Sequence, residues 1–224
     1  MNVRDRIRHV LRFEKADRLP RVEWAPWWEL TIHRWQSEGL PLDMPKDGPG
    51  MVSIQEYFGL DPLYRCKTQS TTAFPKLPEG QGPVSDMESY EAVRRHLYPD
   101  TDWDALLPSW IRGQHLRGEI GIWFVLEGYF WFPRKLFGIE RHLLAFYDYP
   151  DVMRRINEDL LKHHRRIVTS ICGILEPEFM TFAEDMSYNQ GPMLSERMFD
   201  EFMAPYYSEI VPLIKAHDVI PLID

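Results

Sequence analysis

Residues 179–192, FMTFAEDMSYNQGP, are the most informative stretch of this chain. A short apolar run ends at two adjacent acids, Glu184 and Asp185, and a polar turn then leads towards the next helix. An apolar run without alternation is typical of a strand that is covered on both faces. Carboxylates at the end of such a strand are costly to leave unpaired, so this pair indicates a functional position.

Strand and helix patterns alternate along the rest of the chain. Besides 179–183, strands are predicted over 18–24, 63–72, 120–126 and 219–223. Helices are predicted over 3–11, 27–37, 85–97, 102–117 (interrupted at Pro108), 136–147, 150–171 and 195–213 (kinked near Pro205). Residues 41–50 are rich in Pro, Gly and Asp and are predicted to form an irregular excursion. Strands that alternate with long helices imply parallel βαβ units, so the predicted fold class is α/β.

The long helix predicted over 150–171 has one clear apolar face. Pro150 suits its first turn, and one stripe is formed by Met153, Ile156, Leu160, His164, Ile167 and Ile171. In the helix predicted after residue 194, Ser195 is a suitable N-cap. Its buried stripe is predicted to comprise Phe199, Phe202, Tyr206, Ile210 and Leu213.

Composition and charge narrow the functional classes. The chain has 224 residues, 44% hydrophobic and 27% charged, which fits one globular α/β domain or two small ones. A net charge of −8 argues against a nucleic-acid surface. Arginines such as Arg94, Arg95, Arg165 and Arg166 are interleaved with acids, which favours solvated helix faces, with phosphate sites as the alternative.

The sequence predicts a soluble, cytoplasmic protein. Cys66 and Cys172 lie far apart and form no CxxC arrangement, so neither a disulfide framework nor a thiolate zinc site is indicated. The start of the chain has no apolar signal core, and no run of about 18 apolar residues occurs. We therefore expect no membrane and no nucleic-acid partner.

Acids follow several of the predicted strands. These residues are Glu23, Glu127, Glu184 with Asp185, and Asp224. The carboxyl ends of parallel strands lie on one side of an α/β fold, where ligands bind, so these acids outline a candidate active site. The alternative is that each acid caps the helix that follows it. Oxygen ligands of this kind suit Mg²⁺ or Ca²⁺, but no spacing requires a metal, and none is predicted.

Aromatic and polar side chains accompany these acids. Arg134 either binds a substrate carboxylate or pairs with Glu127. Tyr129 either donates a hydrogen bond to an anionic intermediate or lies in the core with its hydroxyl satisfied. Tyr188 and Asn189, in the turn after the acid pair, suit polar contacts with a ligand.

Two segments resemble the uroporphyrinogen decarboxylase-like superfamily. Residues 194–207, LSERMFDEFMAPYY, resemble the helix that this family writes LSpexFxeFxxPY, and residues 6–20, RIRHVLRFEKADRLP, resemble its opening helix and DRvP motif. The resemblance covers most of residues 3–224 and is weakest over 40–118. It implies a (β/α)8 barrel in which residues 1–224 form a single, C-terminally incomplete domain with about five of the eight strands.

The sequence departs from both known chemistries of that superfamily. Where the decarboxylases carry an MRQAGR loop for substrate propionates, residues 24–29 read WAPWWE, and the decarboxylases' SDIL-type Asp has no match near residues 60–63. The zinc-dependent, corrinoid-linked methyltransferases have a His-x-Cys motif after the strand that here ends at Ile223, and Asp224 occupies the His position.

The resemblance implies a cofactor-free carboxy-lyase acting on a flat, carboxylated, tetrapyrrole-like small molecule, as in porphyrin metabolism. Asp185 or Glu184 would stabilise positive charge as CO2 leaves or carry a proton. Tyr129 and Arg134 would hold the substrate, and Trp24 and Trp131 would line the pocket. The alternatives are methyl transfer with a corrinoid protein as partner, and a non-catalytic or truncated barrel chain. The sequence also leaves a homodimer open.

Overall fold

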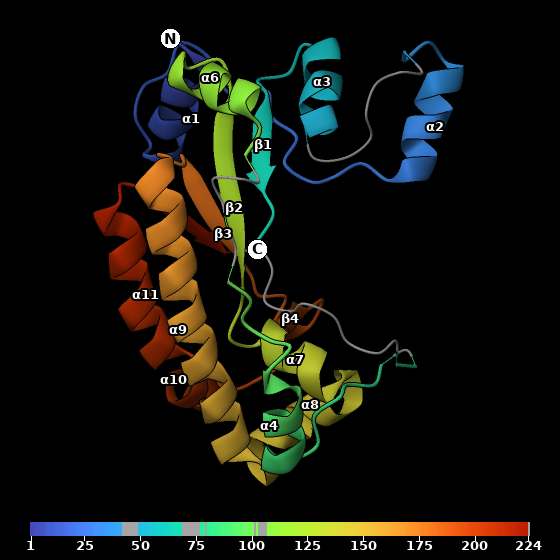
Figure 1. The fold of residues 1–224 in the computed structure, drawn as a ribbon, viewed down its shortest axis with the longest axis vertical. Coiled ribbons are helices and arrows are strands. Elements are labelled where there is room, and N and C mark those ends of the chain that lie inside the picture. Colours follow the sequence, from blue (N-terminus) through green and yellow to red (C-terminus); the bar gives the residue numbers. More distant parts are fainter. Residues whose placement is uncertain (42–48, 69–76, 79, 101, 103–106, 224) are drawn as a thin grey trace. The chain divides into compact units, whose positions relative to one another are not determined.

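A computed structural model shows an α/β fold with a parallel sheet of four strands (Figure 1). It describes residues 1–41, 49–68, 77–78, 80–100, 102 and 107–223. The sheet has the order β1 (Leu63–Cys66), β2 (Gly121–Glu127), β3 (Phe179–Ala183) and β6 (Ile220–Ile223). In the pair β1 and β2, Leu63 lies opposite Gly121 and Cys66 opposite Phe124. The strands predicted over 120–126, 179–183 and 219–223 are confirmed.

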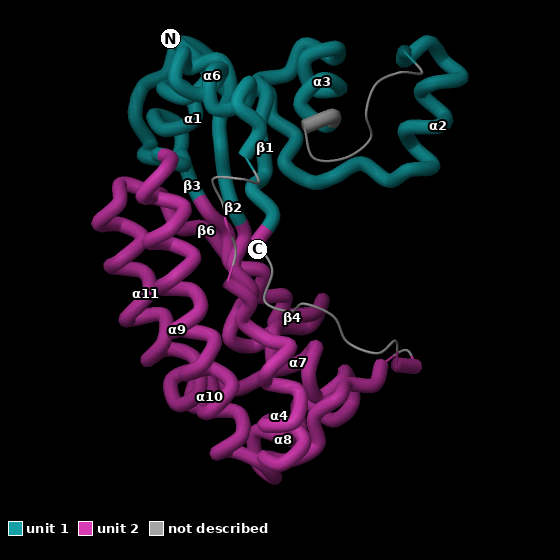
Figure 2. The backbone as a smooth tube through the Cα atoms, in the orientation of Figure 1, with its two compact units in different colours: residues 1–67, 103–124, 176–179 teal, residues 68–102, 125–175, 180–224 magenta. Residues whose placement is uncertain are grey.

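The chain divides into two compact units (Figure 2). Unit 1 comprises residues 1–67, 103–124 and 176–179, and unit 2 comprises residues 68–102, 125–175 and 180–224. Each unit is therefore assembled from three separate stretches of sequence. That residues 1–224 form a single domain stays a prediction.

In unit 1, a buried glutamate connects several elements just before β3. The helices of this unit are α1 (Val3–Leu11), α2 (Glu29–Ser37), α3 (Pro49–Tyr57) and α6 (Ser109–Leu116). The Glu178 carboxylate accepts hydrogen bonds from Arg4 of α1 (2.6 Å) and from the Ile122 backbone of β2 (2.6 Å), and it lies 3.2 Å from Nε2 of His115 in α6. Burial raises the pKa of Glu178, but hydrogen bonds from His115 and Arg4 outweigh it and lower the pKa below the usual value. The Glu178 carboxylate thus connects α1, α6 and β2.

The strand predicted over 18–24 is wrong, because no strand forms there. The Arg21 backbone N–H donates to the Asp61 carboxylate (2.7 Å), and the Asp61 N–H donates to the Arg21 carbonyl oxygen (2.8 Å). Both backbone groups of Arg21 are thus engaged with a single residue, and Pro20 has no N–H to offer a neighbouring strand. Arg18 and Arg6 also bind the Asp61 carboxylate, so ionic contacts hold this segment in place of a β ladder.

Unit 2 is built around one long helix, α9 (Pro150–Ile174). It contacts α4 (Met87–Arg94), α7 (Trp131–Phe137), α8 (Ile139–Asp148), α10 (Glu196–Phe202) and α11 (Ala204–Ala216). Figure 1 shows α9 and α11 side by side. All six residues predicted to form the apolar face of this helix are buried, so the prediction is confirmed. A helix of 3.6 residues per turn turns such a repeat into one continuous stripe.

Several helix boundaries differ from the predictions. The helix predicted over 136–147 is two helices, α7 and α8, separated by Gly138, whose φ of +84° ends the first one. The helix predicted over 195–213 is also divided, into α10 and α11, at Met203 rather than kinked within one helix. Ser195 does cap α10, since its side chain accepts from the Met198 N–H. In the stripe predicted there, Phe202 and Ile210 are buried, and the other three residues are half-buried.

The remaining predicted helices and strands agree with the structure wherever it describes the residues concerned. The helices predicted over 3–11, 27–37 and 85–97 are seen as α1, α2 and α4, and the one over 102–117 is seen after Pro108 as α6. Of the strand predicted over 63–72, residues 63–66 form β1, and residues 69–72 lie outside the described part. The same holds for residues 42–48 of the predicted excursion, whereas Pro49 begins α3. Among the described helices, none has both the length and the apolar character needed to cross a membrane.

Candidate functional site

The carboxyl ends of β2 and β3 lie side by side in unit 2. The Gly128 N–H, one residue beyond β2, donates to the Ala183 carbonyl oxygen at the end of β3 (2.8 Å). Glu127 and Gly128 therefore adjoin Glu184 and Asp185, as the sequence predicted for parallel strands. This location is the candidate functional site.

Glu184 is enclosed by the protein, with 1% of its surface exposed. Its carboxylate accepts hydrogen bonds from the backbone N–H groups of Phe130 (3.0 and 3.1 Å) and Trp131 (3.0 Å). These donors belong to the first turn of α7, whose N-cap residue provides no side-chain cap of its own. A carboxylate at this position satisfies otherwise unpaired N–H groups and interacts favourably with the helix dipole. Glu184 thus caps a helix, but it is α7 rather than the helix that follows it in sequence.

Gly128 makes the approach of Glu184 possible. A Cβ atom at residue 128 would lie 1.8 Å from Oε2 of Glu184 and 2.6 Å from the Ala183 carbonyl oxygen. Both distances are far inside van der Waals contact, so every other residue type would displace the carboxylate or the strand end. A glycine directly after the last strand residue is therefore required by the position of the acid.

Tyr207 of α11 connects Glu184 with Tyr129. The Tyr207 hydroxyl donates a hydrogen bond to Oε1 of Glu184. Its ring meets the Tyr129 ring edge-on at 5.0 Å, and Tyr206 stacks on Tyr129 at 5.2 Å. Nδ2 of Asn157 in α9 donates to the backbone oxygens of Tyr129 and Phe202, both at 3.0 Å. The cluster consequently joins the loop after β2, the end of β3 and three helices.

Burial dominates the electrostatics of this cluster. It raises the pKa of Glu184 to about 7, although hydrogen bonds from Tyr207, Trp131 and Phe130 act in the opposite direction. Burial, together with the Glu184 charge, also raises the pKa of Tyr207 and of Tyr129 well above the usual value. The Tyr129 hydroxyl lies 3.4 Å from Nδ1 of His164, whose pKa burial lowers well below its usual value. Both tyrosines and His164 are neutral at pH 7, and Glu184 exchanges its proton near that pH.

The two adjacent acids face different surroundings. Phe182 and Glu184 both contact Tyr207, so they lie on the side of the strand that α11 covers. Asp185, the second residue beyond the end of β3, is exposed instead. Tyr188 and Asn189 are also exposed, in a small hairpin formed by β4 (Ser187–Tyr188) and β5 (Gly191–Pro192). Of the two acids, Asp185 is the one open to a ligand.

Arg134 and Glu127 do not pair with each other. Glu127 binds Lys135 at 2.7 Å, and the Arg134 guanidinium lies over the Trp131 ring at 4.8 Å. Nη1 of Arg134 and Oε2 of Glu127 are buried, and neither finds a hydrogen-bond partner among the described residues. A buried donor and a buried acceptor of this kind are costly unless a further group binds them.

The remaining predicted site residues are placed as follows. Trp24, in unit 1, packs against Trp123 with ring centroids 5.4 Å apart. Glu23 was expected at the end of a strand, which is wrong: its carboxylate accepts from the nearby Ala25 N–H in an irregular segment. Asp224 lies outside the described residues.

Sequence reasoning missed Gly128, Asn157 and the role of Tyr207 in this cluster. Tyr207 is the last residue of segment 194–207, so its position there was a usable signal. Nothing in the sequence singles out Asn157, because its role depends on two carbonyl groups from distant segments. Across the described ranges, no group of three or more His, Cys, Asp or Glu side chains is arranged to hold a metal ion.

Around this site Asp185 and Tyr188 are exposed, and Arg134 and Trp131 are half-buried. Side chains of these types can bind an anionic, flat molecule and move a proton. No protein-family model matches the chain, and no curated protein matches it either.

Proposed function

We propose that this chain is a (β/α)8-type enzyme of the uroporphyrinogen decarboxylase-like superfamily, acting as a carboxy-lyase on a carboxylated, tetrapyrrole-like small molecule. One observation carries the proposal. The segment that resembles the family, residues 194–207, brings Tyr207 onto Glu184 at the carboxyl end of β3. The acid pair and segment 194–207 thus meet at the carboxyl end of β3, and α/β enzymes bind ligands at the carboxyl ends of their parallel strands.

In this proposal Asp185 is the catalytic acid. During decarboxylation the carbon–carbon bond to the carboxyl group breaks, CO2 leaves, and the remaining carbon takes up a proton. Asp185 is exposed beside the strand end and would stabilise positive charge on the substrate or deliver that proton. Glu184 and Tyr129 are enclosed, so they act as positioning residues that hold the β3 end and the loop after β2.

Arg134 would bind a substrate carboxylate. Its guanidinium is held over Trp131, and its Nη1 atom is buried without a hydrogen-bond partner in the described part of the chain. A carboxylate oxygen would satisfy that donor with a charge-assisted hydrogen bond. Trp131 would then offer a flat apolar surface to the substrate ring, and Tyr188 and Asn189 would add polar contacts from the hairpin.

Methyl transfer to or from a corrinoid is the alternative within the same superfamily. The fit to a zinc ion is poor among the described residues, since none of them form a suitable cluster. The residue at the family's His position, Asp224, lies outside the described part. A third alternative is a barrel-type chain that binds a ligand without turnover.

Activity assays on the purified chain distinguish these three proposals. Uroporphyrinogen is supplied without oxygen and its products are separated by carboxyl number, while methylcobalamin demethylation is followed by absorbance. We expect the wild-type chain to remove carboxyl groups from the substrate. Asp185→Asn should lower the rate of this decarboxylation at least about a hundredfold. Asp200→Asn, an exposed acid in α10, is the matched control and should leave the rate unchanged. Full activity of Asp185→Asn, with its fold intact, would overturn the assignment of the acid, and demethylation alone would favour the alternative.

A further inference from the structure

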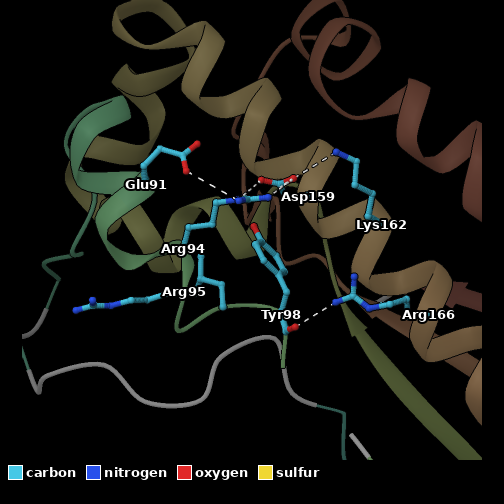
Figure 3. A pocket seen from close by; sticks show the side chains of 8 residues that line it. Glu91, Arg94, Arg95, Tyr98, Asp159, Lys162 and Arg166 are labelled. Carbon is cyan, nitrogen blue, oxygen red and sulfur yellow. Dashed lines mark hydrogen bonds and ion pairs between the residues drawn. The ribbon is translucent and has the colours of Figure 1, made fainter. Parts of the chain in front are cut away.

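A surface pocket, remote in sequence from the acid pair, lies between α4, the segment after it and α9 (Figure 3). Its volume is about 350 Å³, which is sufficient for a small metabolite. Four cationic side chains and two acidic ones line it, although the chain as a whole has a net charge of −8. A local excess of positive charge on an acidic protein attracts anions to that place.

Helical spacing aligns the α9 residues of the pocket. Asp159, Lys162 and Arg166 are separated by three and four residues, so they form one row along the helix. Figure 3 shows the Lys162 and Arg166 side chains projecting from neighbouring turns towards α4 and the segment after it. The opposite wall includes Arg94, the last residue of α4. Two helices therefore present cations to the same space.

Asp159 is already neutralised, which leaves other cations available. Its buried carboxylate binds Arg94 through two contacts (2.7 and 3.2 Å), and it also binds Arg155 (3.1 Å) and the Tyr90 hydroxyl (3.0 Å). Lys162 is 3.4 Å away and largely exposed, so it is the most weakly held of these cationic partners. Its ammonium group can turn to a ligand while Asp159 keeps its other partners.

Arg166 is likewise held by weak contacts. Nη2 donates to the Tyr98 carbonyl oxygen at 3.1 Å, and Nε lies 3.3 Å from Asp100, whose side chain is 92% exposed. An ion pair to such an exposed acid contributes little, and a ligand can replace it. Arg95 lines the rim, and Figure 3 shows its guanidinium extending away from the other three cations. Within the described ranges it forms no ion pair, so it can add to binding by rotating inward.

One residue that lines the pocket, Tyr98, has an unusual backbone conformation. Tyr98 has a φ of +60°, which is rare for residues other than glycine and rarest for those with bulky side chains. Its buried hydroxyl lies 2.9 Å from the Tyr90 hydroxyl and 3.3 Å from the Ile156 carbonyl oxygen, so packing and hydrogen bonds hold the conformation. Backbone conformations of this kind are found most often at binding and catalytic sites. The conformation aims the Tyr98 carbonyl at Arg166, and so helps to position the guanidinium.

From this geometry we propose that the pocket is a binding site for a phosphate-bearing small molecule. A phosphate monoester carries a charge of about −1.5 to −2 at neutral pH, which matches the excess of two cations in the lining. Its oxygens accept hydrogen bonds from the Arg166 guanidinium in a two-point contact and from the Lys162 ammonium. Arg94, fixed by Asp159, supplies further positive charge at the back of the site. The site stands independently of the carboxy-lyase proposal, since the two share no residue.

Calorimetric titration of the full chain with inorganic pyrophosphate tests the site, at constant ionic strength. We expect saturable binding with a Kd of about 1 mM or tighter. Lys162→Gln and Arg166→Gln should each weaken it at least about tenfold. Arg165→Gln is the matched control, because this exposed arginine adjoins Arg166 on the same helix but pairs with Glu209 outside the pocket. It should change the Kd less than about twofold.

Three results would overturn the proposal. The first is no saturable binding of pyrophosphate to a wild-type chain whose circular dichroism shows it to be folded. The second is equal weakening by Arg165→Gln, which would indicate a diffuse surface charge rather than a site. The third is tighter binding of citrate than of pyrophosphate, which would contradict the choice of phosphate over carboxylate ligands.

Discussion

The proton of Glu184 should make the stability of this protein depend on pH in an unusual direction. Burial raises the pKa of Glu184 to about 7 in the folded chain, against 4.5 for an ordinary glutamate side chain. One pKa unit corresponds to about 1.4 kcal/mol, so the difference amounts to about 3 kcal/mol. That is a large share of the roughly 5–15 kcal/mol that stabilises a typical domain.

The sign follows from which state binds the proton more tightly. Between about pH 4.5 and pH 7 the folded chain keeps the Glu184 proton while the unfolded chain loses it. The contribution of this group to the free energy of unfolding is therefore full below pH 4.5 and is lost as the pH rises through 7. The usual carboxylate behaves in the opposite way, because ion pairs and hydrogen bonds lower its folded-state pKa.

Glu184→Gln isolates this effect. A glutamine keeps the shape of the protonated acid, since its Oε1 can accept from the Phe130 and Trp131 N–H groups and its amide can donate to the Tyr207 oxygen. We expect the variant to match wild type at pH 4.5 and to exceed it by up to about 3 kcal/mol at pH 8. Urea unfolding followed by circular dichroism across this pH range gives the two free energies.

Asp185→Asn is the control for this experiment. It removes the neighbouring, exposed acid, so its effect on the free energy of unfolding should stay within about 0.5 kcal/mol at both ends of the range. If Glu184→Gln were less stable than wild type at pH 8, the three hydrogen bonds would outweigh burial and the folded chain would hold Glu184 as an anion. A difference between Glu184→Gln and wild type that does not vary with pH would show that the folded state does not raise the pKa of Glu184.

Three further substitutions test the packing around the candidate site and the buried Glu178 cluster of unit 1. Gly128→Ala should destabilise the chain by about 3 kcal/mol or abolish folding, measured by urea unfolding, because its Cβ would lie 1.8 Å from Oε2 of Glu184; a neutral effect would show that the strand end is loose. Asn157→Ala leaves two buried carbonyl groups without their donor and should cost about 2 kcal/mol, seen as a lower Tm. Glu178→Gln breaks a buried ionic cluster and should lower the free energy of unfolding by about 3–5 kcal/mol. A gain in stability would mean that burying these charges costs more than their ion pairs contribute.

The central strands and the long helix could be predicted because their patterns are local. Residues 120–126 and 179–183 are continuous apolar runs, which suit strands covered on both faces, and β2 and β3 form there. The apolar residues of α9 repeat with the helical period, so the buried face was predictable residue by residue. The strand predicted over 18–24 failed because a strand also needs a partner, and Asp61 takes both backbone groups of Arg21 instead.

The pocket between α4 and α9 could not be predicted from sequence patterns. In the sequence, Arg94, Arg95 and Arg166 are interleaved with acids and resemble solvated helix faces. In the structure, α4 and α9 bring some of these cations to one space, and a single buried acid, Asp159, organises them. Net charge within a short stretch of sequence does not reveal which charges end up together.

The amino-acid sequence predicts the alternation of strands and helices and the acids that follow residue 183. The different surroundings of these two acids follow from tertiary packing. Glu184 is buried, caps α7 and binds Tyr207 of α11, whereas Asp185 is exposed. Which of two adjacent residues is buried depends on helices that are distant in sequence, such as α11, which supplies Tyr207. Burial excludes water from Glu184 and raises its pKa, while Asp185 stays exposed.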